Sequence, residues 1–176
     1  MLTLSARESS GAPFNRSRKY LMSLFPESFE QPSGRAVLLS IKPKYADLIL
    51  AGTKRVELRR SWPSSDIGVM VLYSSSPKQR LVGVAFIDRI EECDFESLWT
   101  LADANGGGVT YDELRAYVKG KKTAFGVMIQ RIKIAEVQVD PKDLFANFTP
   151  PQSFLYLGPN DFPRVMRAMF PSEGSV

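Results

Sequence analysis

The spacing of hydrophobic residues predicts a dense series of strands and helices that begins near residue 35. An apolar run or an alternating pattern predicts a strand in each of these segments: 36–41, 55–62, 69–76, 80–93 and 123–139. Apolar residues three and four positions apart predict helices over 43–54, 94–106, 110–121 and 160–170. Several adjacent strands are joined by short turns, so we expect a mixed or antiparallel sheet curled into a small β-barrel with flanking helices, an α+β fold.

Polar residues and glycines at the ends of these segments support the assignment. Asp94 precedes one helical pattern and Asp161 another, so both are expected to cap a helix N-terminus. Thr110 and Glu113 have the spacing of a capping box. Gly83 lies inside a strand pattern, which indicates a bulge or a close approach of another backbone.

Composition changes along the chain and predicts its organisation. Residues 1–34 are rich in Ser, Gly, Pro and mixed charges, which predicts a partly flexible N-terminal extension that can also dock a protein partner. Residues 35–157 form the predicted domain, and 158–176 a C-terminal helix and tail. No apolar run is long enough for a transmembrane helix, and the N-terminus lacks the apolar region of a secretory signal.

The residue types that are rare in this chain exclude several kinds of chemistry. The chain has no histidine, so neither Ser-His-Asp nor Cys-His activation is available. Cys93 is the single cysteine, which excludes a disulfide framework and a cysteine zinc site and favours a cytoplasmic location. We expect no metal site. The net charge of +4 is a mild indication of a polyanionic partner, although an ordinary basic protein has the same charge.

The segment GTKRVELRR, residues 52–60, gathers charge where a helix gives way to a strand. Glu57 and Arg59 are two apart, so a strand places them on one face together with Arg55. Lys54 can converge on the same point, and two cations flanking a carboxylate can bind phosphate. Glu57 would then accept a hydrogen bond from a base or orient Arg59. From the pattern alone, an exposed ion-pair ladder worth about 0–1 kcal/mol is slightly favoured.

The same segment carries the motif G-x-K-x-x-E-x-R, and with it the chain resembles the ASCH family of the PUA-like superfamily. The neighbouring stretches SIKPKYADLILAG, LYSSSPKQRLVGVAFID, TAFGVMIQRI and PPQSFLYL resemble that family in order, so the resemblance covers roughly residues 36–157. It implies a small β-barrel with a cleft beside the first helix. It also implies binding of RNA, another single-stranded nucleic acid or a modified nucleotide, with a regulatory role such as transcriptional regulation. The motif then becomes the expected lining of a site.

The resemblance leaves catalysis open, and the residues favour a binding module over an enzyme. One group of the family hydrolyses N4-acetylcytidine with a lysine that corresponds to Lys54 and a threonine nucleophile. Glu57 stands in place of that threonine, and the stretch 104–110 lacks the glutamate expected of that group. A ribonuclease that uses Lys54, Glu57 and Arg59 is the main alternative. A divalent cation is expected only in that case, and otherwise no cofactor.

Further candidates for contact with nucleic acid lie outside the motif. Lys42 and Lys44 flank a proline at a helix start, where backbone N–H groups also face a phosphate, or they are simply solvated lysines. Ser74 and Ser75 end a buried strand, where turn chemistry is the alternative. The resemblance adds the cleft-wall candidates Gln152 and Tyr156. Three glycines at 106–108 break a helix but lack the following Gly-Lys of a phosphate loop.

Overall fold

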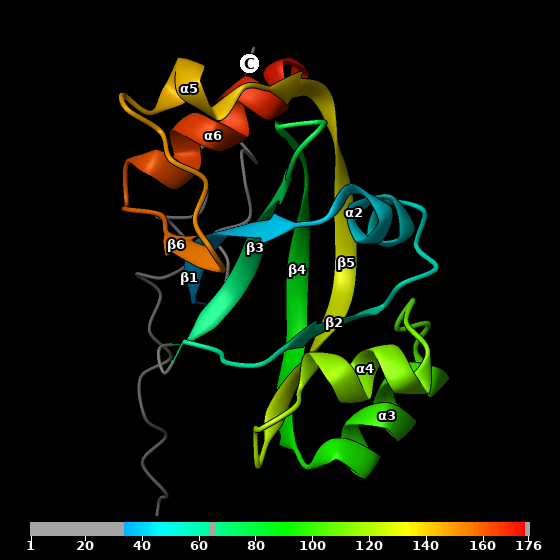
Figure 1. Cartoon of the computed structure of the whole chain (residues 1–176). Helices are drawn as coiled ribbons and strands as arrows, with labels where there is room; N and C mark the ends of the chain where they lie inside the picture. Colours follow the sequence, from blue (N-terminus) through cyan, green and yellow to red (C-terminus); the bar gives the residue numbers. More distant parts are fainter. Residues whose placement is uncertain (1–33, 64–65, 175–176) are drawn as a thin grey trace, which may run out of the picture.

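The computed structural model describes residues 34–63 and 66–174 (Figure 1). The predicted extension 1–34 therefore lies outside the described residues, apart from its last glycine. In chain order the elements are β1 Arg35–Ile41, α2 Pro43–Leu50, β2 Val56–Arg59, β3 Ile67–Ser74, β4 Arg80–Cys93, α3 Phe95–Ala104, α4 Tyr111–Tyr117, β5 Ala124–Val139, α5 Pro141–Leu144, β6 Phe154–Tyr156, α6 Asp161–Met169 and a short 3-10 turn Pro171–Gly174. No helix in the described ranges is long and apolar enough to cross a membrane.

One curled sheet organises the molecule. Its strand order is β2-β5-β4-β3-β1-β6. Strands β1 and β3 pair in parallel, and the other neighbours pair antiparallel. Helices α3 and α4 lie at one end of the long strands β4 and β5, whereas α5 and α6 lie at the other end (Figure 1). The predicted α+β class and mixed, barrel-like sheet are confirmed.

Hydrophobic cores form on both faces of the sheet. Strand β1 is buried on both sides, because Leu38 packs in one core while Val37 and Leu39 pack in the other. Helix α2 covers the second core with Ala46 and Ile49. Helix α6 covers the first with the buried residues Phe162, Val165, Met166, Met169 and, just after it, Phe170. A third core joins α3 and α4 to β2 and the start of β5.

Most of the local signals act as the sequence predicts. Asp94 caps α3 by accepting a hydrogen bond from Ser97 N at 2.9 Å, and the Thr110–Glu113 capping box is complete. Gly83 lies at a shift of strand register, and a Cβ there would stand 2.8 Å from the carbonyl oxygen of Lys133. Both the bulge and the close approach are confirmed.

Four local predictions are wrong, and one of them is the helix expected over 110–121, which ends at Tyr117. Asp161 is the first residue of α6 rather than its cap; it pairs with Arg164 instead, at 3.6 Å. The helix expected over 43–54 ends at Leu50, because Thr53 N and Lys54 N both donate hydrogen bonds to the carbonyl of Leu48. The strand expected over 55–62 is limited to β2, which pairs with only four residues of β5.

Candidate functional site

Three charged side chains of the motif are buried together. Lys54, Glu57 and Arg59 are only 2%, 6% and 9% exposed. Glu57 bridges the two cations: its Oε2 lies 3.7 Å from Lys54 Nζ and its Oε1 lies 3.1 Å from Arg59 Nε. The prediction of an exposed ion-pair ladder is therefore wrong for these three residues. The expected convergence of Lys54 on the Glu57–Arg59 pair is confirmed. Arg55 is exposed and is not part of the cluster.

Backbone carbonyls hold the two ends of this cluster. Lys54 Nζ donates to the carbonyl of Gly107, in the loop between α3 and α4, at 2.5 Å. Arg59 Nη2 donates to the carbonyl of Ser40, near the end of β1, at 2.8 Å. Arg59 Nε has no aligned hydrogen-bond acceptor among the described residues, despite its ion pair with Glu57. The cluster thus spans from the α3–α4 loop to β1 and keeps one buried donor without an aligned acceptor.

Burial changes the acid–base chemistry of Lys54. Removal from water disfavours its ammonium form, and this lowers the pKa of Lys54 from its usual range. Glu57 opposes the shift by charge attraction and hydrogen bonding, while Arg59 adds to it by repulsion. Lys54 therefore releases its proton more readily than a solvated lysine does. Such a group can serve as a cation for an anionic ligand or as a proton acceptor.

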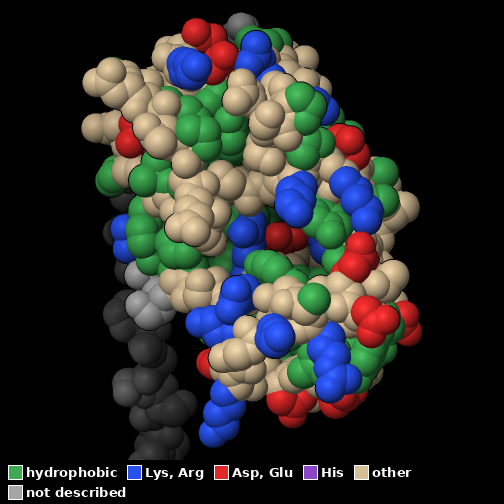
Figure 2. Space-filling model, in the orientation of Figure 1, with side chains coloured by type: hydrophobic (Ala, Val, Ile, Leu, Met, Phe, Trp, Pro, Cys, Tyr) green, Lys and Arg blue, Asp and Glu red, His purple; other side chains and the backbone are tan. Residues whose placement is uncertain are grey.

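The cluster lies in a pocket of about 700 Å³. Lys42 and Tyr45 from the start of α2 line one part of the wall, and the segment 150–152 lines another. Helix α4 and Val109, two residues before it, add mostly apolar side chains to the lining, among them Leu114 and Tyr117. Figure 2 shows a hollow with an acidic side chain in its depth and Lys and Arg side chains around it. The pocket combines apolar walls with a charged floor, as binding sites for small polar groups do.

The structure brings six of the predicted site residues together. They line the pocket: Lys42, Lys54, Glu57, Arg59, Ser75 and Gln152. Three others do not line it. Ser74 is completely buried, Lys44 is exposed with Nζ 5.3 Å from the Tyr45 ring centre, and Tyr156 pairs with β1 beneath the guanidinium of Arg35.

The lining also holds side chains that were missed in the sequence, among them Tyr45 and Glu113. Tyr45 fits the apolar spacing of α2 and carries no separate signal, yet its ring centre lies 5.5 Å from Lys54 Nζ. Glu113 lines the pocket although the stretch 104–110 itself holds no glutamate. Its Oε2 accepts from Thr110 N at 2.8 Å, and this hydrogen bond lowers the pKa of Glu113, with help from the charge of Lys44. The capping-box spacing predicts this carboxylate as a helix cap but not as part of a pocket.

Comparison with known proteins places this fold and motif in a family. The family model described as ASCH domain matches residues 39–136, so the chain belongs to the ASCH family, with its PUA-like fold. The chain is similar to a protein of Zymomonas mobilis subsp. mobilis described as an ASCH domain-containing ribonuclease, at 29% identity over 72% of this chain and 86% of that protein.

Solved structures show the same fold. The ASCH protein of Zymomonas mobilis matches with a TM-score of 0.69 and 24% identity, over 75% of this chain and 94% of that one. A serine-to-alanine variant from the same organism matches with a TM-score of 0.71 and 22% identity, over 78% of this chain and 99% of the variant. The resemblance seen in the sequence is confirmed.

Proposed function

We propose that this chain binds RNA or another single-stranded nucleic acid through the pocket, as a regulatory module. The observation that carries the proposal is the buried Lys54–Glu57–Arg59 cluster on the floor of a 700 Å³ pocket. When Lys54 is protonated, two cations face one carboxylate, so the cluster has an excess positive charge. Buried charge without a partner is costly, and a phosphate group would balance it.

The unused hydrogen-bonding capacity of Arg59 supports a phosphate ligand. Its Nε faces Glu57 at 3.1 Å and its Nη2 donates to the carbonyl of Ser40, so the remaining guanidinium N–H groups are the ones left for a ligand. A guanidinium binds phosphate oxygens through two parallel N–H groups, which suits a side chain that is already oriented by Ser40 and Glu57. Lys54 adds a second cation, and Lys42, which lines the same pocket, would contact a neighbouring phosphate.

The remaining lining suits a nucleobase. Glu57 is acceptor-only when ionised, so it can receive a hydrogen bond from a base amino group. Tyr45 and the apolar residues Leu58, Val109 and Leu114 offer contact surface for the base faces. Ser75 and Gln152 add neutral hydrogen-bonding groups at the wall. The pocket can therefore hold a phosphate and a base together.

A matched pair of arginine variants tests this proposal. Arg59→Ala removes the guanidinium that is proposed to bind phosphate. Arg55→Ala removes an equal charge from an exposed position outside the pocket. We expect Arg59→Ala to weaken binding of a labelled single-stranded RNA by about ten- to a hundredfold, and Arg55→Ala by only a few-fold. Thermal unfolding checks that both variants are folded. Equal losses in the two variants, or no salt-dependent binding by the wild type, would overturn the proposal.

A ribonuclease is the second candidate, supported by the similarity to the Zymomonas ASCH domain-containing ribonuclease. Lys54 and Arg59 would stabilise the negative charge that develops on the phosphorus, and Glu57 would act as a base or hold a cation. Incubation of RNA with and without divalent cations separates the two functions. Cleavage that Glu57→Gln abolishes and the control Glu91→Gln, outside the pocket, retains would establish the enzyme. Binding without product would establish the module.

A further inference from the structure

The three glycines at 106–108 pack directly against the motif. A Cβ atom on Gly106 would stand only 2.0 Å from the carbonyl oxygen of Thr53, the residue before Lys54. Directly before this glycine, the carbonyl of Asn105 accepts from Arg55 N at 2.9 Å, so the loop and the motif are hydrogen-bonded to each other. The loop thus contacts both chain neighbours of Lys54, which are Thr53 and Arg55. Its approach to Thr53 is so close that only glycine fits at position 106.

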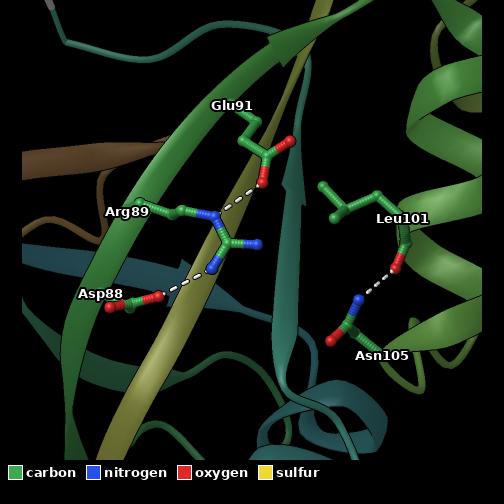
Figure 3. Close-up of polar contacts among 5 residues, drawn as sticks. All are labelled: Asp88, Arg89, Glu91, Leu101 and Asn105. Carbon is green, nitrogen blue, oxygen red and sulfur yellow. Dashed lines mark hydrogen bonds and ion pairs between the residues drawn. The ribbon is translucent and has the colours of Figure 1, made fainter.

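Helix α3 determines where this loop lies. Asn105 Nδ2 donates to the carbonyl of Leu101 at 2.8 Å, which closes the end of the helix (Figure 3). Gly107 N donates to the carbonyl of Ala102 at 2.7 Å. Ala102 is itself buried in the core that α3 shares with β2. The Gly107 carbonyl that meets Lys54 is therefore fixed through the helix to the same strand that carries Glu57.

We propose that the segment Asn105–Gly108 is a positioning element. It holds the Lys54 ammonium beside Glu57 in the pocket and keeps water away from the aliphatic part of the Lys54 side chain. Lysine has a flexible stem with several rotatable bonds, so a lysine at the end of a turn does not by itself have one orientation. The carbonyl of Gly107 supplies the direction, and the absence of side chains at Gly106 and Gly108 lets the loop close over the lysine. This inference rests on the proposed role of Lys54 in binding phosphate.

Two glycines with positive φ angles provide a matched test. Gly106 and Gly120 both follow a helix and have positive φ angles of 62° and 80°. A Cβ on Gly120 would meet nothing within 4 Å, so Gly120→Ala incurs the same kind of conformational cost without displacing a neighbour. Gly106→Ala must push the loop away from Thr53. If Gly106→Ala does not fold, Gly108→Ala replaces it, because its nearest contact is the flexible end of Leu48 at 2.8 Å.

The readouts are the titration of the Lys54 amine and the affinity for single-stranded RNA. Labelling with an amine-reactive reagent over a pH series, read by mass spectrometry of the Lys54 peptide, gives the pH of half-reaction. We expect this pH to rise towards that of an exposed lysine in the loop variant, with RNA binding about tenfold weaker. In Gly120→Ala neither quantity should change.

The outcomes separate the two ideas. An unchanged Lys54 titration in the folded loop variant, or an equal change in Gly120→Ala, overturns the positioning role. A shifted titration with unchanged RNA affinity supports the positioning role and instead contradicts the proposed part of Lys54 in binding.

Discussion

Water access to single residues controls the chemistry of the pocket, and Lys54 shows this most directly. It is almost completely buried, and the pairing with Glu57 only partly offsets the loss of hydration. The ammonium form is therefore less stable in the folded protein than in the unfolded chain. This difference connects the protonation of Lys54 to the stability of the fold.

The pH dependence of unfolding measures this connection. In the unfolded chain Lys54 keeps its proton up to about pH 10.4, whereas in the fold it loses it at a lower pH. Between these two pH values the unfolded state binds more protons, so stability rises with pH. We expect the free energy of unfolding of the wild type, relative to Lys54→Met, to rise across this alkaline window. Urea denaturation over a pH series measures it, and parallel curves would contradict the prediction.

Ser74 gives a second prediction for a single residue. Its hydroxyl is completely buried and has no hydrogen-bond partner among the described residues. Removing an unsatisfied polar group costs little or is favourable, so Ser74→Ala should change the free energy of unfolding by less than about 1 kcal/mol. The RNA affinity should not change, because Ser74 does not line the pocket. A loss of affinity would restore Ser74 as a binding residue.

The motif predicts the floor of the site from sequence, but the walls depend on distant segments. Strand alternation treats Arg55, Glu57 and Arg59 as equivalent, whereas Arg55 precedes β2 and stays exposed. The partner of Lys54 is a backbone carbonyl 53 residues away, which no side-chain pattern indicates. Glu113 likewise enters the pocket only because α4 packs beside β2 in the third core.

Among the elements, helix α4 both closes the pocket and depends on its cap. Thr110 Oγ1 accepts from Glu113 N at 3.2 Å, and Glu113 Oε2 accepts from Thr110 N at 2.8 Å. The helix is short, so its N-terminal hydrogen bonds are a large share of its support.

Replacing the capping threonine tests this dependence. We expect Thr110→Ala to lower the free energy of unfolding by about 1 kcal/mol, measured by urea denaturation. Thr100→Ala is the matched control, because the exposed hydroxyl of Thr100 donates a hydrogen bond to the carbonyl of Glu96 within α3 and caps no helix end. We expect a change of less than about 0.5 kcal/mol there. Equal losses in the two variants would show that the cap does not stabilise α4.

The order of the elements follows from local periodicity, but their arrangement does not. The apolar runs and alternating segments predict the main strands, and the pattern over 80–93 matches β4 from end to end. The parallel pairing of β1 with β3 joins strands that are separated by α2 and β2. Strand β6 has three residues and pairs with β1. Such pairings depend on contacts distant in sequence, which a local pattern does not contain.

For the molecule as a whole, α6 belongs to the main core. The predicted domain 35–157 leaves this helix in a separate C-terminal segment, and the family model ends at residue 136. In the structure α6 packs on the face of the sheet formed by Leu38, Val69 and Val71. No residue of α6 lines the pocket, so its contribution to the protein is separable from binding.

A core substitution after α6 tests this separation. Phe170 is completely buried against the sheet, so Phe170→Ala leaves a cavity and should lower the free energy of unfolding by about 3–5 kcal/mol. Leu155→Ala is the control: its side chain is 44% exposed on β6, and the loss should be below about 1 kcal/mol. At a temperature where both variants are folded, their RNA affinities should equal that of the wild type. A Phe170→Ala protein that unfolds with wild-type stability would show that the sheet does not need α6.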